Sequence, residues 1–296
     1  KGIMTLVDEA AQTRVLAALD GVAITRCAGG SAANTIVAVA DFGDVQGWKV
    51  EMAIEDDGAS AEGGAAVANK LVADQTFVAM AGHAFSGATA AAMPIYEKAG
   101  VPMMSPSATN PDLTTKGSTV FNRNAFTDTE QGIGAAKYLY EKLGIKKLAL
   151  MHDGTDYGQG LAKVVEENFA ALGGEVVAFE AVTPGESDYS APLAAVASAK
   201  PEGLYFGGYN AEASVLVNQM EQAGLAGVVF FGGDGIYGKD FLTKAGKNGE
   251  GVYSATLVPP GTDPILAFNK AYLDAYGTEA GVLSAYTWNS YDAVSA

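Results

Sequence analysis

Small polar side chains follow two apolar runs in the first half of the sequence. Ser86 comes shortly after the run at residues 77–81, where a helix is expected to begin. A hydroxyl beside free helix N–H groups could bind a carboxylate, and an ordinary helix cap is the alternative. Ser107 and Thr109 follow the run at residues 101–105, in a loop that two prolines stiffen. For this loop, a plain turn is the alternative.

Aromatic and acidic residues occupy the corresponding positions in the second half. Tyr157 and Tyr209 each follow a predicted strand, and either ring could stack against an apolar ligand and offer its hydroxyl. Asp234 lies between glycines after a third strand, where its carboxylate could meet an ammonium group. Singly, these residues are equally typical of a domain surface or a turn. Taken together, the hydroxyls, the helix start, the aromatic rings and the carboxylate suit a zwitterion with an apolar tail.

The residues needed for catalysis or for metal binding are scarce. The single cysteine, Cys27, cannot form an internal disulfide or build a thiolate zinc site. The two histidines, His83 and His152, stand at strand ends, where a structural role is the more common one. Neither a G-x-S-x-G nucleophile motif nor a G-x-x-x-x-G-K-[ST] phosphate loop occurs. We therefore expect no catalytic residue, no metal and no cofactor.

The elements that must position these residues alternate along the chain. Short apolar runs and amphipathic stretches follow one another, a pattern that indicates α/β structure with parallel sheets. One series of units runs to about Asn122 and a second runs from about Arg123 to Gly251, which predicts two lobes with a ligand cleft at the strand ends. The expected strands are residues 49–55, 77–81, 101–105, 147–152, 175–181, 204–207 and 228–231, and the expected helices are 62–74, 88–99, 131–143, 161–172, 191–199 and 211–223.

Composition narrows the classes of partner. The 296 residues are 49% hydrophobic and carry a formal net charge of −16, so a large core is expected and an acidic surface argues against nucleic-acid binding. No apolar stretch reaches the ~20 residues of a membrane-spanning helix. No signal peptide is recognisable at the start, which leaves a cytoplasmic protein or a mature, processed form.

Several segments together resemble a known family. From about residue 47 to residue 296 the sequence resembles the type I periplasmic substrate-binding proteins of ABC transporters, in the leucine/isoleucine/valine-binding branch. The resemblance implies two doubly wound parallel-sheet lobes, joined by hinge strands, that close over a ligand. The segments that carry it are residues 55–58 (Glu-Asp-Asp-Gly), 66–70 (Ala-Val-Ala-Asn-Lys), 105–111 (Ser-Pro-Ser-Ala-Thr-Asn-Pro), 152–160, 205–209 (Tyr-Phe-Gly-Gly-Tyr) and 291–293 (Tyr-Asp-Ala).

The resemblance assigns roles to the six residues. Ser86 matches a position that hydrogen-bonds the ligand carboxylate, and Ser107 and Thr109 match positions that hold the α-carboxylate and α-ammonium groups. Tyr157 and Tyr209 match the tyrosines of the second lobe. The last of the six, Asp234, matches an acidic position that is often Glu and pairs with the ammonium. Its shorter side chain and Phe85, at a position where cysteine is common, are departures from the family pattern.

The N-terminal segment departs further. Residues 1–44 lack the usual first strand and instead resemble the start of ribokinase-family (PfkB) sugar kinases, in particular the Gly-Gly-Ser-x-x-Asn-Thr stretch at residues 29–35. The catalytic Gly-Ala-Gly-Asp motif of those kinases is absent. We expect a strand at residues 22–26 and a helix at 31–42 that replace the usual unit. At the other end, the resembling family normally continues beyond the Tyr-Asp-Ala stretch.

These observations define the expected protein. We expect a first lobe of residues 1–122 plus about 252–296, and a second lobe of 123–251. The expected function is that of a non-enzymatic solute-binding component that takes a small aliphatic amino acid and passes it to the membrane permease of an ABC importer. We further expect a monomer in the periplasm, or a lipid-anchored extracellular protein in a Gram-positive organism, in mature form without its signal peptide. One alternative is a binding or sensory protein for a small amide or an aromatic acid on the same fold, and another is a ribokinase-family kinase.

Overall fold

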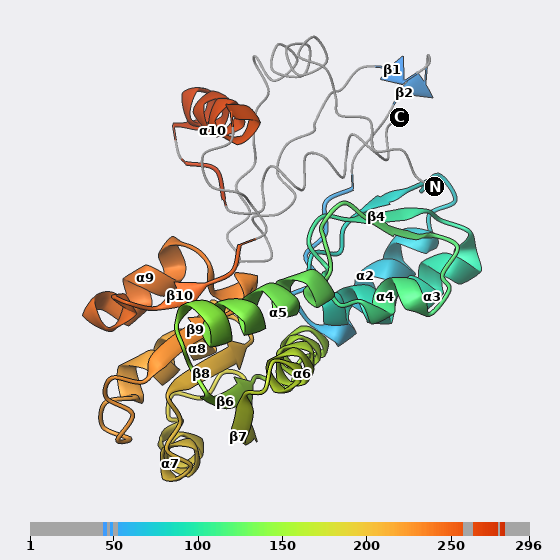
Figure 1. The fold of residues 1–296 in the computed structure, drawn as a ribbon. Coiled ribbons are helices and arrows are strands. Elements are labelled where there is room, and N and C mark those ends of the chain that lie inside the picture. Colours follow the sequence, from blue (N-terminus) through green and yellow to red (C-terminus); the bar gives the residue numbers. More distant parts are fainter. Residues whose placement is uncertain (1–43, 46–47, 50–52, 257–262, 278, 282–296) are drawn as a thin grey trace.

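The computed structural model describes residues 44–45, 48–49, 53–256, 263–277 and 279–281. Its helices and strands alternate along the chain, and two parallel sheets carry them (Figure 1). The α/β class with parallel sheets that the sequence predicts is therefore confirmed. We use "first lobe" for the elements from α2 to β5 and "second lobe" for those from α5 to β10.

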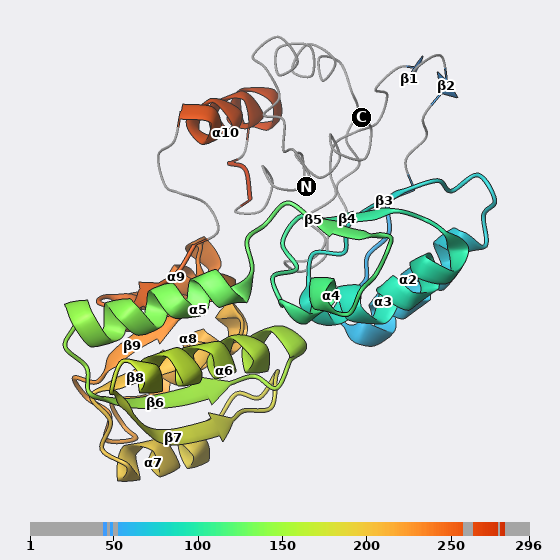
Figure 2. The same ribbon diagram turned by 45° about the vertical axis from the view of Figure 1, so that its right-hand side comes forward.

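The first lobe is built on a three-stranded parallel sheet in the order β3-β4-β5. Helices α2, α3 and α4 lie along one side of this sheet (Figure 2). Val67 and Leu71 of α2, Tyr96 of α3 and Met103 of β4 pack in one core. The elements are α2 (Ala61–Val72), β3 (Met80–Ala81), α3 (Ser86–Ala99), β4 (Met103–Ser105), α4 (Asp112–Thr115) and β5 (Phe121–Arg123).

The second lobe has a five-stranded parallel sheet in the order β10-β9-β8-β6-β7. Its helical elements are α5 (Asp128–Lys137), the π-helical turn η2 (Tyr138–Lys142), α6 (Asp156–Ala171), α7 (Ser190–Ser198), α8 (Asn210–Gln219), the 3₁₀ turns η3 (Asp234–Ile236) and η4 (Gly246–Gly249), and α9 (Lys239–Ala245). Its strands are β6 (Lys147–His152), β7 (Glu175–Ala181), β8 (Gly203–Gly207), β9 (Val229–Gly232) and β10 (Tyr253–Ser254). Two further short strands, β1 (Asp44–Val45) and β2 (Trp48–Lys49), form an antiparallel pair, and α10 (Asp263–Tyr276) follows β10 in the chain.

Helices cover both faces of the second sheet, which explains why its strands are apolar on both sides. In β6, Leu148 and Leu150 pack with α5 and α6, whereas Ala149 and Met151 pack with α7, α8 and α9. Alternate side chains of a strand point to opposite faces, so a strand buried on both faces becomes a continuous apolar run. This doubly wound arrangement is the one that the sequence predicts for the lobe.

Most predicted elements are present, and the differences lie at their ends and near the N-terminus. The predicted strand at 49–55 is wrong for residues 53–55, which are not in a strand, while residues 50–52 lie outside the described part. The described part of the first sheet begins with β3 instead. The predicted strand at 22–26 and helix at 31–42 also lie outside the described residues.

Candidate functional site

Ser86 is the first residue of α3 and lies buried at its N-terminus. The N-cap position belongs to Phe85, whose side chain has no hydrogen-bonding atom, so the helix start has no side-chain cap. The Ser86 hydroxyl instead accepts a hydrogen bond of 3.2 Å from the backbone N–H of Asn110. Ser86 therefore is not an ordinary N-cap, and it ties α3 to the loop that carries the other two predicted residues.

Ser107 and Thr109 lie in that loop, directly after β4. Ser107 donates a hydrogen bond of 2.8 Å to the carbonyl of Ala84, and this bond links the loops that follow β3 and β4. Thr109 is only 1% exposed, yet its hydroxyl makes no hydrogen bond to any residue in the described part of the chain. Buried hydroxyls normally have a partner. The Thr109 hydroxyl lies near enough to Asp128 to lower the pKa of that carboxyl, so Asp128 and a ligand atom are the two candidates for its partner.

The guanidinium of Arg123 holds this loop in place through hydrogen bonds. It donates hydrogen bonds of 2.8 Å to the carbonyls of Ala108 and Asn110 and one of 2.6 Å to the hydroxyl of Thr114. This rigid donor fork fixes the backbone that flanks Thr109. Arg123 is a contact that sequence reasoning missed, since a single arginine after a short strand carries no distinguishing signal.

Tyr157 and Tyr209 come together in the second lobe. Their rings stack with centroids 5.1 Å apart. The start of α6 lies tightly against the end of β8, because a Cβ atom on either Gly158 or Gly207 would collide with the carbonyl of the other. These two glycines thus allow the approach that places the tyrosines side by side.

Asp234 is hydrogen-bonded to one of these tyrosines, Tyr157, and to Gln131. Its carboxylate oxygen Oδ1 accepts hydrogen bonds of 2.7 Å from the Tyr157 hydroxyl and 2.7 Å from the Gln131 amide nitrogen. The backbone N–H of Asp234 donates to the other end of that amide at 2.7 Å, and the N–H of Gly235 donates to the Tyr157 hydroxyl at 3.0 Å. Burial raises the pKa of Asp234, while the hydrogen bonds from Tyr157 and Gln131 lower it, and the net shift is upward.

Another carboxyl group, that of Asp128, is fully buried and contacts both the loop at Thr109 and the residues that hold Asp234. Its N–H donates to the Thr109 carbonyl at 3.0 Å, and its Oδ1 accepts from the Gln131 amide at 3.2 Å. Burial and then the charge of Asp234 raise the pKa of Asp128 to about 8, against smaller lowering effects from Thr109, Arg123 and Gln131. Sequence reasoning missed Asp128 and Gln131, because Thr127-Asp128-Thr129-Glu130 is typical of an ordinary helix start.

The two lobes meet at these residues. The ring of Phe85 in the first lobe lies edge-on to Tyr209, with centroids 5.1 Å apart. The side-chain amide of Asn110 donates a hydrogen bond of 2.7 Å to the carbonyl of Asp156 at the start of α6. The structure thus brings Tyr157, Tyr209 and Asp234 into direct contact, connects Ser86, Ser107 and Thr109 through one pair of loops, and joins both groups at the inter-lobe contact.

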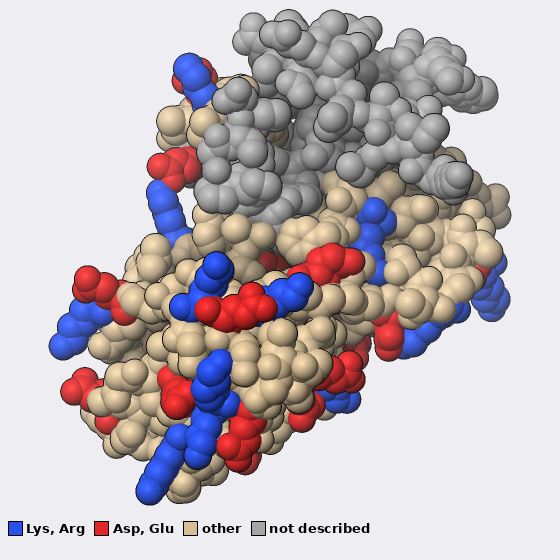
Figure 3. Space-filling view, in the orientation of Figure 1, with Lys and Arg blue, Asp and Glu red and all other residues tan. Residues whose placement is uncertain are grey.

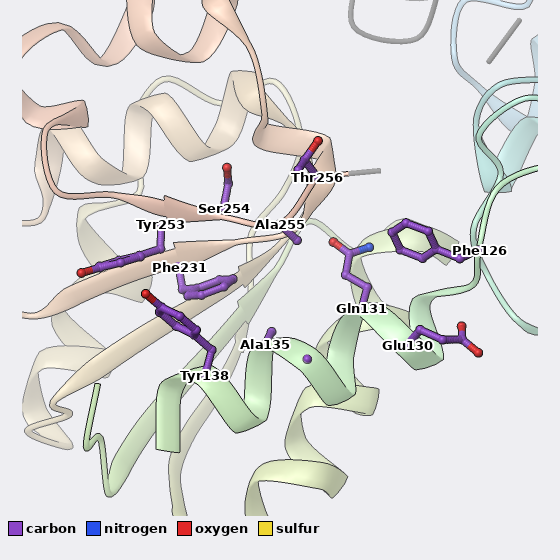
Figure 4. A pocket seen from close by; sticks show the side chains of 11 residues that line it. Phe126, Glu130, Gln131, Ala135, Tyr138, Phe231, Tyr253, Ser254, Ala255 and Thr256 are labelled. Carbon is purple, nitrogen blue, oxygen red and sulfur yellow. The ribbon is translucent and has the colours of Figure 1, made fainter. Parts of the chain in front are cut away.

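A separate hollow lies on the second lobe (Figure 4). It measures about 680 Å³, and the six predicted residues are not among those that line it. Gln131, the residue that contacts Asp234, lies at one end of the hollow beside Phe126. The lining is Phe126, Glu130, Gln131, Gly134, Ala135, Tyr138, Phe231, Tyr253, Ser254, Ala255 and Thr256.

The charged side chains and the candidate metal ligands show which kinds of chemistry the described residues can offer. On the face seen in Figure 3, acidic and basic side chains lie interspersed over the second lobe. Among the described residues, no cluster of three His, Cys, Asp or Glu side chains is arranged to hold a metal ion. Helices within the described ranges are also too short or too polar to cross a bilayer. The distinctive chemistry of the site is therefore buried carboxyls, hydroxyls and aromatic rings.

Comparison with known proteins gives a consistent result. Residues 16–296 match a family described as periplasmic binding protein, a match that starts before the resemblance noted from about residue 47. The Leu/Ile/Val-binding protein of Citrobacter freundii is 35% identical over 261 residues, which cover 87% of this chain and 70% of that protein. An amino acid binding protein of Pseudomonas aeruginosa is 33% identical, over 85% of this chain and 67% of its own length.

Solved structures share the fold. A leucine-binding protein from Thermotoga maritima superposes with a TM-score of 0.77 at 29% identity, over 84% of this chain and 71% of that one. A branched-chain amino acid substrate-binding protein from Streptococcus pneumoniae, solved with isoleucine, gives a TM-score of 0.71 at 32% identity over the same shares of each chain. Fold, family match and relatives agree, and the chain belongs to the type I periplasmic binding proteins, in the branch of the leucine/isoleucine/valine-binding proteins.

Proposed function

We propose that this protein binds one free aliphatic amino acid, of the branched-chain type, between its lobes. The observation that carries the proposal is Asp234, whose carboxylate is fixed by Tyr157 and Gln131 and has no cationic partner among the described residues. Asp234 is partly withdrawn from water, and a carboxylate in that position without a counter-ion is costly, so this site favours a ligand that supplies a cation. The names of the relatives, which bind leucine, isoleucine and valine, support the same class of ligand.

The carboxylate of the ligand would lie toward the first lobe. There the uncapped start of α3 at Ser86 and the unpaired hydroxyl of Thr109 offer donors, and Ser107 fixes the loop between them. Tyr157 and Tyr209 would pack against the ligand from the second lobe. Closing the lobes would then bury both charged ends of the amino acid at once.

The remaining parts of the proposal concern the protein's setting. We propose a non-enzymatic role, because the family consists of binding proteins and the described residues of the site include no nucleophile paired with a base. The bound amino acid would be delivered to the permease of an ABC importer, in the periplasm or outside a Gram-positive cell. We also propose a monomer that binds no nucleic acid. The proposed lobe bounds stay 1–122 plus about 252–296 and 123–251, except that β10 (Tyr253–Ser254) pairs with β9 and so belongs to the second lobe.

A thermal-shift screen tests the ligand class. The twenty amino acids, a set of small amides and benzoate are each added to the whole chain, because a ligand that binds only the folded state raises the melting temperature. We expect leucine, isoleucine or valine to give the largest shift, and the methyl ester of the best amino acid to give far less. A larger shift from an amide or from benzoate, or an ester that matches the free acid, would overturn the proposal.

A further inference from the structure

The side-chain amide of Gln131 joins the buried carboxyl group of Asp128 to the partly exposed carboxyl group of Asp234, the proposed partner of the ligand ammonium group. The side-chain nitrogen of Gln131 lies 2.7 Å from Oδ1 of Asp234 and 3.2 Å from Oδ1 of Asp128. Asp128 is fully buried, and its second oxygen, Oδ2, has no hydrogen-bond partner in the described part of the protein. Both carboxyl groups accept from the same amide nitrogen, and the charge of Asp234 raises the pKa of Asp128, so the two do not ionise independently.

The surroundings offer little to balance two negative charges. Arg123 is the cation whose charge lowers the pKa of Asp128, but its guanidinium donates hydrogen bonds to carbonyls and to Thr114. Neither Asp128 nor Asp234 forms an ion pair with a described residue. Among the described residues, the ionisable side chains that interact with the two carboxyls are Arg123 after β5, Tyr157 on α6, Tyr205 on β8 and Tyr209 before α8, and the two carboxyls on α5 and η3 also interact with each other.

The three tyrosines stay neutral near pH 7. Burial and then the neighbouring carboxylates hold the pKa of Tyr157, Tyr205 and Tyr209 well above the usual value. The same causes, burial and the charge of Asp234, raise the pKa of Asp128 to about 8. Of the two carboxyls, Asp128 is the more deeply buried, while Asp234 is partly exposed and receives two hydrogen bonds on one oxygen. The single proton of the pair therefore resides on Asp128.

We propose that Asp128 carries a proton in the ligand-free protein and releases it to solvent when the ammonium group of the ligand settles beside Asp234. The O–H bond of the Asp128 carboxyl breaks, the proton passes to water and then to buffer, and the carboxylate that remains faces the new cation. Amino-acid capture is thus coupled to the loss of one proton. This inference rests on the proposed function, and it assigns to that function a proton-carrying residue outside the six predicted from sequence.

The coupling fixes a direction for the pH dependence. The ammonium group of the ligand stabilises the ionised form of Asp128. Binding therefore becomes stronger as the pH rises, because less free energy is then needed to remove the proton from Asp128. Affinity should rise from about pH 6 to about pH 8, by close to tenfold per pH unit where one proton is released, and then level off. A site with a single carboxylate that is already ionised would show no such slope over this range.

Calorimetric titration with L-leucine tests the coupling on the whole chain. At pH 7, titrations in phosphate and in Tris differ in enthalpy by the number of protons released multiplied by the difference between the buffers' ionisation enthalpies. We expect nearly one proton per leucine. Asp128→Asn should reduce the release to near zero and flatten the pH dependence, whereas Asp240→Asn, which changes an exposed aspartate of α9, should retain both.

The outcomes separate this inference from the proposed function. Equal enthalpies in both buffers, or a proton release that persists in Asp128→Asn, would overturn the coupling while leaving amino-acid binding intact. Absence of binding by leucine, isoleucine and valine would instead overturn the proposed function. If Asp128→Asn does not fold, infrared difference spectra of the unaltered protein decide: the carbonyl band of a protonated carboxyl should disappear when leucine binds, and its persistence would contradict the proposal.

Discussion

Removing one hydroxyl, that of Tyr157, should weaken both the fold and the ligand site. The hydroxyl donates to Asp234 at 2.7 Å and accepts from the backbone N–H of Gly235 at 3.0 Å. A hydrogen bond to a charged group contributes about 1.5–3 kcal/mol, and an unpaired buried N–H costs about 1–3 kcal/mol. Because the two effects overlap, we expect Tyr157→Phe to lower the free energy of unfolding by roughly 2–4 kcal/mol.

The same change should alter binding in a pH-dependent way. The hydrogen bond from Tyr157 lowers the pKa of Asp234 against the larger effect of burial, so its loss raises that pKa further. Less of the carboxylate is then ionised at a given pH, so the dissociation constant for leucine should rise, and it should rise more near pH 6 than near pH 8.

Two measurements and one control test this reasoning. Urea denaturation followed by circular dichroism gives the change in stability, and calorimetry at both pH values gives the change in affinity. Tyr138→Phe is the matched control, because that ring lines the separate hollow and is 42% exposed. Wild-type stability and affinity in Tyr157→Phe, or equal losses in the control, would refute the account of the Asp234 network.

Three further changes have defined outcomes. Asp57→Asn should lower the free energy of unfolding at pH 7 by about 1–3 kcal/mol. Burial raises the pKa of Asp57, but hydrogen bonds from His83, at 2.6 Å, and from a backbone N–H lower it, and the net shift is downward. The stability difference should therefore vanish well below the ordinary pKa of 3.8, and denaturation at several pH values measures it. Asn110→Ala removes the inter-lobe bond to the Asp156 carbonyl and should speed leucine dissociation about two- to tenfold in stopped-flow experiments, whereas an unchanged rate would exclude that bond from closure. Asp128→Asn should stabilise the ligand-free protein at pH 7 by up to about 4 kcal/mol, because the pKa of Asp128 is about 8 in the folded protein and near 3.8 in the unfolded chain. This gain in stability should disappear near pH 3, as thermal melts would show.

Sequence patterns predicted best the elements that are buried on two faces. The bounds of β6 and β7 agree with the predicted strands at 147–152 and 175–181, because apolar runs bounded by polar turns mark such strands directly. Helix α5 was predicted to begin at Gln131, but it begins at Asp128, where Thr127 and Glu130 form a capping box. That signal is present in the sequence, and it moves the helix start to include the second buried carboxyl.

The site could be predicted only in part, because its contacts join distant parts of the chain. Tyr157, Tyr209 and Asp234 each stand after a strand, and the carboxyl ends of parallel strands meet at one edge of a sheet. The amide bridge from Gln131 to Asp234 spans 103 positions, and no local pattern predicts such a contact. Likewise, the pKa of Asp128 depends on burial and on Asp234, and both arise only in the folded chain.

The most direct test of the central claim is a calorimetric titration of the whole chain with leucine, isoleucine and valine at pH 7.5. We predict saturable binding of at least one of them, at one site per chain, and a loss of about 2–5 kcal/mol of binding free energy in Asp234→Ala. Absence of binding by all three amino acids, or an Asp234→Ala variant that binds as tightly as the wild-type protein, would contradict it.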